Sequence, residues 1–206
     1  MNQTAVDPVI PAAGSMIIPM QQEVVPLPLE QIFGATAPLE VDVGCGKGRF
    51  LTARAAAHPG RNFIGIEQRL KRVQKVDKKA CRAGLKNVRV IYGDAELAVE
   101  TMLPPASVAV YYISFSDPWP KRRHHERRVF NGKFMDAVHR TLVSGGVLNF
   151  TTDHQDYFRL VHRVLAAEKR FEAAAAYEPP PEEWSEFEIT FRSLQRPIYR
   201  CAFRRL

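Results

Sequence analysis

The sequence predicts an α/β fold in which a mostly parallel sheet is covered by helices on both faces. From Pro38 onward, short runs rich in Val, Ile and Leu alternate with longer amphipathic runs, which is the order of repeated βαβ units. Parallel strands need crossover connections that return over the sheet, so helices must cover it. The 206 residues suffice for one domain with a sizeable core.

The elements follow in order from the N-terminus. Residues 1–30 hold five prolines and no hydrophobic period, so we expect an irregular arm, followed by one domain over residues 31–206. Expected strands are 39–43, 62–66, 88–92, 108–115 and 147–151, and expected helices are 48–58, 68–83, 95–102, 126–142 and 154–168. The tail, 187–203, has aromatic and β-branched residues around Pro197, and we expect two further strands there.

Charge and cysteine usage narrow the class of protein. Twenty-nine Lys and Arg against 22 Asp and Glu give a formal net charge of +7 and a pI of about 9.5, which favours polyanionic partners such as nucleic acid. The three cysteines are far apart, so neither a zinc cluster nor a disulfide framework is expected. No segment reaches the roughly 18 apolar residues of a membrane span, and we expect a cytoplasmic protein with no bound metal.

The first chemical motif joins the first expected strand to the first expected helix: Asp42-Val43-Gly44-Cys45-Gly46-Lys47-Gly48. Its glycines let the backbone turn tightly and approach a ligand. The spacing fits poorly both the dinucleotide-binding loop and the phosphate-binding P-loop, which needs Ser or Thr after Gly-Lys. Asp42 would repel a diphosphate but can bind the amino end of a methionine moiety. We therefore expect S-adenosylmethionine, with a purely structural Asp42 as the alternative.

Two more acids follow the next two strands. Glu67 lies about twenty residues beyond the glycines, where a carboxylate can accept hydrogen bonds from ribose hydroxyls. Asp94 follows Tyr92-Gly93 and can bind an adenine amino group, although it is also a good helix N-cap. Because ligands of open α/β sheets bind at the carboxyl ends of strands, the three acids together favour an adenosine-type ligand.

A second motif, Asp117-Pro118-Trp119-Pro120-Lys121-Arg122, leads directly into Arg123-His124-His125-Glu126-Arg127-Arg128. A carboxylate, an aromatic plate and a dense cationic run suit a site where a nucleic-acid base is held beside a charged reactant. A proline-stiffened surface turn with solvated charges is the alternative. The two histidines lack a second cluster of ligands, which argues against a metal.

These motifs carry a family resemblance. The glycine loop, Glu67, Gly93-Asp94 and the run from Phe115 to His124 together resemble the bacterial tRNA guanine-N7 methyltransferases, over about residues 32–200. The resemblance implies a single-domain class I methyltransferase (Rossmann-like) fold with a mostly parallel seven-stranded sheet. It implies transfer of a methyl group from S-adenosylmethionine to N7 of the variable-loop guanine, position 46, of tRNA. Ser185 stands where the family has Thr, and Arg196 where one branch has Gln.

The resemblance also assigns roles to residues. Asp117 is expected at the catalytic centre, where it orients the reactants, because guanine N7 carries a lone pair and no proton to remove. Cofactor binding is expected from Asp42, Gly44, Gly46, Glu67, Asp94 and Asp117. Substrate binding is expected from Lys121, Asp153, Ser185 and Glu188. On the residues alone, Asp153 is equally a helix cap, and Glu188 with Trp184 and Phe187 is equally a packed tail.

RNA needs a surface as well as a pocket. In the helix expected at 68–83, Arg72, Lys75, Lys79 and Arg82 recur on one face, and Leu70, Val73, Val76 and Ala80 mark another. The cationic face can bind RNA phosphates; the alternative is that it is a solvated helix face. Two other functions remain open: an S-adenosylmethionine enzyme with a non-tRNA substrate leaves the basic loop unexplained, and a non-catalytic RNA-binding module leaves the cofactor acids unexplained. The residues do not distinguish a monomer from a homodimer.

Overall fold

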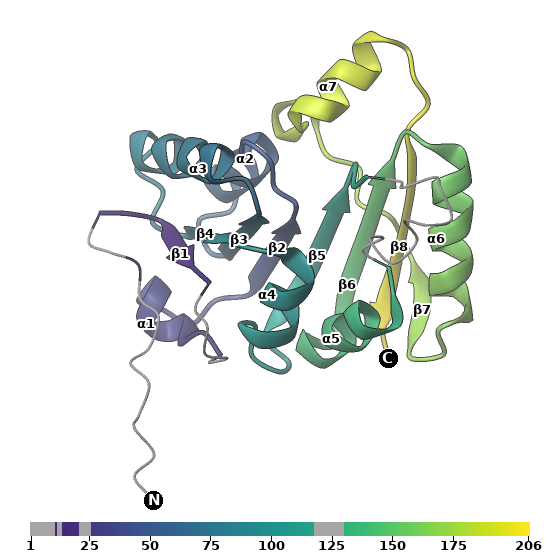
Figure 1. Cartoon of the computed structure of the whole chain (residues 1–206), viewed down its shortest axis with the longest axis horizontal. Helices are drawn as coiled ribbons and strands as arrows, with labels where there is room; N and C mark the ends of the chain where they lie inside the picture. Colours follow the sequence, from purple (N-terminus) through teal and green to yellow (C-terminus); the bar gives the residue numbers. More distant parts are fainter. Residues whose placement is uncertain (1–10, 12–13, 21–25, 118–129) are drawn as a thin grey trace, which may run out of the picture.

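A computed structural model describes the chain at residues 11, 14–20, 26–117 and 130–206. Its strands form an eight-stranded sheet in the order β1-β4-β3-β2-β5-β6-β8-β7 (Figure 1). The strands are β1 Ile17–Pro19, β2 Leu39–Val43, β3 Asn62–Glu67, β4 Val88–Tyr92, β5 Val108–Ser114, β6 Leu142–Thr152, β7 Phe171–Ala174 and β8 Tyr199–Arg205. The helices are α1 Leu29–Phe33, α2 Arg49–Ala57, α3 Leu70–Arg82, α4 Ala95–Thr101, α5 Gly132–Thr141, α6 Gln155–Ala167, the 3₁₀ helix η2 Pro181–Glu183, and α7 Glu186–Ser193.

The sheet is parallel from β1 to β6, and β8 runs antiparallel between β6 and β7. The carboxyl ends of the parallel strands therefore meet at one edge. The predicted mostly parallel α/β fold is confirmed, but the predicted number of seven strands is wrong. The additional strand is β1, which pairs with β4 and buries Ile18 completely. Part of the N-terminal arm, expected to be irregular, thus extends the sheet.

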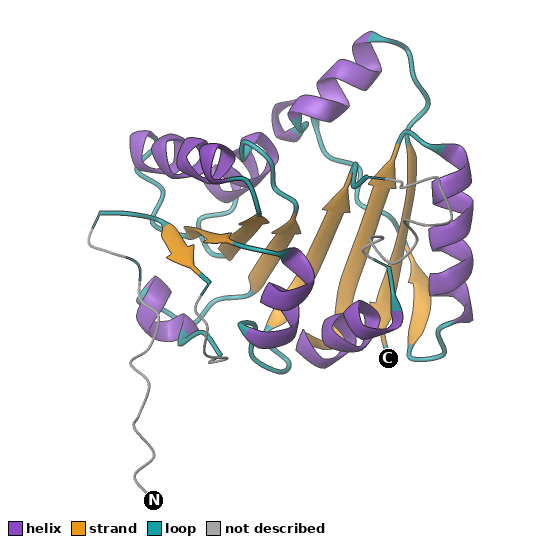
Figure 2. Ribbon diagram, viewed as in Figure 1, coloured by secondary structure: helices purple, strands orange, loops and turns teal. Residues whose placement is uncertain are grey.

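Helices lie on both faces of the sheet (Figure 2). Each face has its own hydrophobic core. One core joins side chains of α4, α5 and α6 to alternate residues of the strands, such as Val41 and Ile64. The other joins α2 and α3 to residues of opposite parity, such as Phe63 and Val90. Successive strand residues point to opposite faces, so Glu40 and Asp42 of β2 lie on the face of α2 and α3. None of the described helices is long and apolar enough to cross a membrane.

The tail differs most from its prediction. Two strands were expected within 187–203, on either side of Pro197. The first is wrong, because Glu186–Ser193 form helix α7, whereas the second is confirmed as β8. Ser185 caps α7 by accepting a hydrogen bond from the backbone N–H of Glu188 (3.1 Å), and helical spacing places Phe187 and Phe191 on one face with their rings stacked. These local interactions outweigh the β propensity of the segment.

Two smaller expectations also change. Among the described residues, the helix expected at 126–142 begins at Gly132, because the side chain of Asn131 caps it by accepting from the N–H of Phe134 (2.9 Å). Leu70, expected on the packed face of α3, is 45% exposed at the first position of the helix, whereas Val73 and Val76 are fully buried.

Candidate active site

A pocket of about 240 Å³ lies between the glycine loop, the ends of β5 and β6, and the start of α7. Its floor follows from strand register. Asp42 of β2 pairs with Tyr112 of β5, which pairs with Asn149 of β6, so these three side chains form a row on one face of the sheet. Ser114 and Thr151 form the next row toward the carboxyl edge, and all five residues line the pocket.

The glycine loop forms one wall and is anchored to β3. The backbone N–H groups of Gly44 and Cys45 both donate to the carbonyl oxygen of Ile66, at 2.9 and 3.0 Å. Gly48, directly before α2, has φ +73°, and a Cβ there would lie 2.8 Å from Val76 of α3. Any larger residue would therefore strain the backbone and separate α2 from α3. The expected cofactor residues Gly44 and Gly46 both line the pocket.

The carboxylate of Asp42 lies in an unfavourable electrostatic environment. Its side chain is buried, and burial together with the neighbouring carboxylates of Glu67 and Glu186 raises its pKa to about 7. None of the hydrogen bonds found among the described residues reaches this carboxylate. A cation bound in the pocket would relieve both the repulsion and the lost hydration.

The other two expected cofactor acids lie at the same edge but outside the lining of this pocket. Glu67 is buried, accepts from the backbone N–H of Arg69 (2.9 Å), and forms an ion pair with Arg72 (3.3 Å). Asp94 is exposed and caps α4 by accepting from the N–H of Leu97 (3.0 Å). Its cap role is therefore present, and its remaining oxygen stays available to a ligand.

The opposite wall is the C-terminal segment. Ser185 and Glu188, both expected to bind substrate, line the pocket, and Glu188 is almost completely buried. Arg192 (2.9 Å) and Arg200 (2.5 Å) both donate to the same oxygen, Oε1, of Glu188. The two guanidiniums fix the orientation of this carboxylate at the pocket wall.

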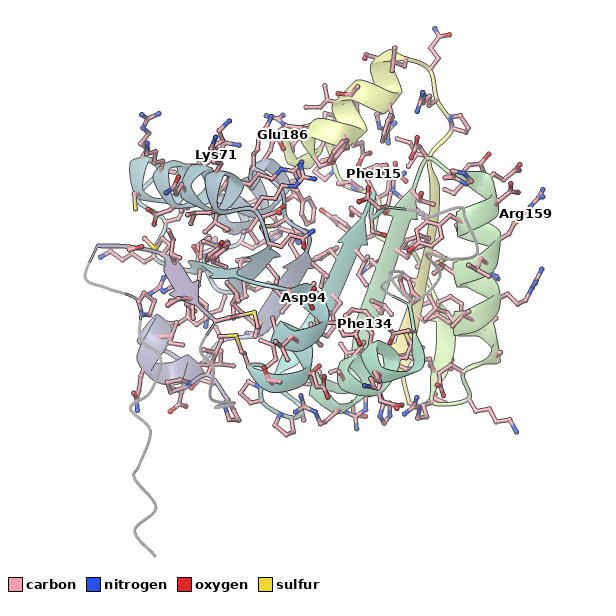
Figure 3. The ribbon with its side chains drawn as sticks, in the orientation of Figure 1. Lys71, Asp94, Phe115, Phe134, Arg159 and Glu186 are labelled. Atoms are coloured by element: carbon pink, nitrogen blue, oxygen red, sulfur yellow. The ribbon has the colours of Figure 1, made fainter. Side chains whose placement is uncertain are left out.

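The mouth of the pocket is aromatic. Phe187, 48% exposed, lines the pocket and stacks on Phe191, and both rings contact Phe115 at the end of β5. Figure 3 shows Phe115 at the end of β5, below α7, and Glu186 between α7 and α3. Phe115 has φ +54°, an unusual conformation for a large side chain, and two residues later the chain reaches Asp117, which is exposed. Lys121 and the rest of the basic motif lie outside the described residues.

Asp153 does not cap α6, and its expected role in substrate binding stays a prediction. The cap of α6 is His154, whose Nδ1 accepts from the N–H of Tyr157 (3.3 Å). Asp153 instead forms an ion pair with Arg196 (3.1 Å) at the base of the C-terminal segment and does not line the pocket.

Sequence reasoning missed several lining residues: Phe50, Tyr112, Asn149, Tyr177 and Glu186. Tyr112 and Asn149 belong to strands whose ends were predicted. Because side chains alternate between the two faces of a sheet, the strand positions could have shown that these residues lie on the same face as Asp42. Tyr177 and Glu186 lie before the expected strands of the tail, in a segment for which no element was expected. Two residues of the predicted basic face of α3 form ion pairs within the protein: Arg72 with Glu67, and Lys79 with Glu186 (3.2 Å). Lys75 and Arg82 remain exposed.

The pocket suits S-adenosylmethionine. The buried carboxylate of Asp42, whose pKa is raised by burial and by nearby acids, can bind the cationic amino end of the methionine moiety. The space that a Cβ would fill at Gly44 and Gly46 is open. Glu67 at the end of the neighbouring strand is placed to accept hydrogen bonds from ribose. The residues present therefore fit this group.

Comparison with known sequences agrees with this geometry. Residues 36–201 match the model of a family described as "Putative methyltransferase". The tRNA (guanine-N(7)-)-methyltransferase of Sodalis glossinidius is 38% identical over 183 residues, covering 87% of this chain and 74% of that protein. The protein of the same name from Thiobacillus denitrificans is 36% identical over 192 residues, covering 92% and 84%.

Comparison with solved structures identifies the same fold. A 16S rRNA methyltransferase superposes with a TM-score of 0.67 at 14% identity, covering 93% of this chain and 99% of that one. A 30S ribosomal A1408 methyltransferase from an uncultured bacterium has a TM-score of 0.59 at 19% identity, covering 86% and 92%. At these identities the likeness concerns the fold alone.

Proposed function

The chain belongs to the family of tRNA (guanine-N(7)-)-methyltransferases, and from this premise we propose that it methylates N7 of the guanine at position 46 in the variable loop of tRNA. It is an S-adenosylmethionine-dependent enzyme. One observation supports the proposal above the others. A single pocket joins Asp42 and the glycine loop, on the cofactor side, to Ser185 and Glu188, on the substrate side.

On the cofactor side, Asp42 binds the amino end of the methionine moiety, and Gly44 and Gly46 give it room. Glu67 accepts hydrogen bonds from ribose, and Asp94 binds the adenine amino group with the oxygen that does not cap α4. When bound, S-adenosylmethionine supplies the electrophilic methyl group and a positive charge that offsets the acids around it.

On the substrate side, the residues have to align a base rather than deprotonate it. Guanine N7 carries an in-plane lone pair and no proton, so positioning and charge stabilisation supply the catalysis. Glu188, oriented by Arg192 and Arg200, accepts hydrogen bonds from the guanine edge, and Ser185 supports it. Asp117 faces the charge that grows on the purine, and Phe187 offers a ring on which the base stacks.

RNA outside the pocket meets positive charge. Lys121, Arg122 and Arg123 follow Asp117 in the sequence, Arg196 is exposed, and Lys75 and Arg82 are exposed on α3. Phosphate contacts from such residues position RNA without reading its sequence. We place the reaction in the cytoplasm, with the tRNA it modifies.

The test is incubation of the protein with labelled S-adenosylmethionine and unmodified tRNA, followed by nucleoside analysis. We expect 7-methylguanosine, and we expect it to disappear when adenine replaces guanine at position 46. A tRNA that keeps this guanine but carries a substituted guanine elsewhere serves as the control. Label in another nucleoside, or 7-methylguanosine that survives the substitution at position 46, would contradict the proposal.

A further inference from the structure

A buried polar network lies behind the pocket, on the same face of the sheet as Asp42. Its centre is Glu40, two residues before Asp42 on β2 and fully buried. Arg54 of α2 donates to both oxygens of Glu40 (2.6 and 3.3 Å), Arg61 donates to one of them (2.8 Å), and the hydroxyl of Tyr112 donates to the other (3.0 Å). A carboxylate this deeply buried is stable only with such a set of donors.

Arg54 also reaches the C-terminal segment. Its Nη1 donates to the carboxylate of Glu183 in η2 (3.2 Å) and to the hydroxyl of Tyr177 (2.8 Å), and its guanidinium lies over the ring of Tyr177, 4.4 Å from the centroid. The hydroxyl of Tyr177 in turn donates to Glu183. Burial and the hydrogen bond to Glu183 raise the pKa of Tyr177 above its ordinary value, which keeps the phenol protonated as a donor.

The same segment carries the substrate wall of the pocket. Ser185, which caps α7, follows Glu183 by two residues. The backbone N–H of Tyr177 donates to Asn149 on the pocket floor (2.9 Å), and Nε of Arg49, the first residue of α2, donates to the carbonyl oxygen of Trp184 (2.8 Å). The rings of Tyr112, Tyr177 and Phe50 pack edge to face or tilted against one another and line the pocket.

We infer that Arg54 and Glu183 are positioning residues, which hold the substrate-binding segment Tyr177–Glu188 at a fixed place relative to the cofactor-binding glycine loop. The inference rests on the proposed function for its consequence in catalysis. Its physical basis is that α2 begins at the glycine loop and, through Arg54, binds the segment that leads to Ser185 and Glu188. Reacting atoms must be aligned to within fractions of an ångström, so a loosened segment lowers turnover even when each ligand still binds.

The test uses two mild variants that leave the pair of Glu40 and Arg54 intact. Glu183→Gln removes the charge that Arg54 holds, and Tyr177→Phe removes one hydroxyl from the same link. The matched control is Glu182→Gln, the exposed neighbour in η2. We expect kcat/KM for tRNA to fall about tenfold in each test variant, with kcat falling more than KM rises, while S-adenosylmethionine affinity measured by calorimetry stays within about twofold. The double variant should lose much less than the product of the two single losses, because both changes break one link.

A second readout does not depend on activity. The chain has two tryptophans, Trp119 and Trp184, so a Trp119→Phe background leaves Trp184, directly after Glu183, as the reporter of the segment. In the ligand-free protein, we expect faster acrylamide quenching of Trp184 in Glu183→Gln and Tyr177→Phe, and unchanged quenching in Glu182→Gln. Unchanged quenching in both test variants, or an equal loss of cofactor affinity and turnover, would overturn the inference. If the protein failed to methylate tRNA, only the proposed function would fall, and the quenching result would still decide whether the segment is held by Arg54.

Discussion

Replacing Asp42 by Asn should make the ligand-free protein more stable while weakening cofactor binding. The pKa of Asp42 rises from its ordinary value of 3.8 to about 7, chiefly because the side chain is buried and also because Glu67 and Glu186 are close. A tenfold change in an ionisation equilibrium is about 1.4 kcal/mol, so the ionised carboxylate destabilises the folded state by roughly 4 kcal/mol above pH 7. The folded state binds the proton of Asp42 more tightly than the unfolded state does. The stability that this protonation contributes is therefore fully present below pH 3.8 and is lost as the pH rises to about 7.

The assay is urea or thermal unfolding of the ligand-free protein from pH 5 to pH 8. We expect the stability of the unaltered chain to fall across this range and that of Asp42→Asn to fall much less, with a melting temperature about 10 °C higher at pH 8. Calorimetry should show S-adenosylmethionine binding weakened about thirtyfold or more, because the cation loses its buried partner. The control is Asp156→Asn, whose side chain is 83% exposed and should not alter the curve. Parallel curves for Asp42→Asn and the unaltered chain would refute the reasoning.

Three further changes separate the parts of the site. Asp117→Asn should lower the rate of tRNA methylation while cofactor affinity, measured by calorimetry, stays nearly unchanged; unaltered turnover would contradict its role beside the reacting base. Phe187→Leu should weaken tRNA binding or turnover about tenfold, in line with the loss of one stacked base. Phe187→Tyr keeps an aromatic ring and should therefore retain the binding and turnover of the unaltered chain. Equal activity of the Leu and Tyr variants would exclude stacking. A Lys75→Ala and Arg82→Ala double variant should bind tRNA with a salt dependence shallower by up to about two in the slope of log K against log salt, and an unchanged slope would show that this face is only solvated.

The central strands are predictable because burial on both faces leaves continuous apolar runs between loops of glycine and acid. The bounds expected for β2 and β4 agree with the structure, and those for β3 and β5 differ by one residue at the carboxyl end. The same regularity gave the edge at which Asp42, Glu67 and Asp94 lie, since parallel strands end together. Strand β1 was not predictable in this way, because three residues in a proline-rich arm carry no period of their own and pair only when the edge of β4 is available.

In the tail, local sequence preference predicts the wrong element. Residues 186–193 hold Phe, Ile and Thr, which favour strands, yet a helix forms because Ser185 caps it and two phenylalanines four residues apart pack on Phe115. The cap is local and visible in the sequence, whereas the packing on Phe115 is tertiary and is not. The motif therefore named two residues that line the pocket, Ser185 and Glu188, but not the helix that presents them. The network behind it was invisible, because Glu40, Arg54 and Glu183 each look like ordinary solvated charges until they are buried together.

The distribution of charge explains how one protein can bind two ligands of opposite sign. The chain carries a formal net charge of +7, yet Asp42, Glu186 and Glu188 line the pocket and Glu67 lies beside it. The positive net charge favours the approach of a polyanion to the surface of the protein. Inside the pocket the nearby carboxylates dominate, since charges more than about 8 Å away are largely screened at physiological salt. Buried groups are screened much less, so the acids retain their preference for a cation. Because Arg72 and Lys79 pair with Glu67 and Glu186, the same basic helix also limits the repulsion among these acids. Arg72 and Lys79 of α3 are therefore neutralised by acids at the pocket, whereas other cations of the same helix, Lys75 and Arg82 among them, are exposed.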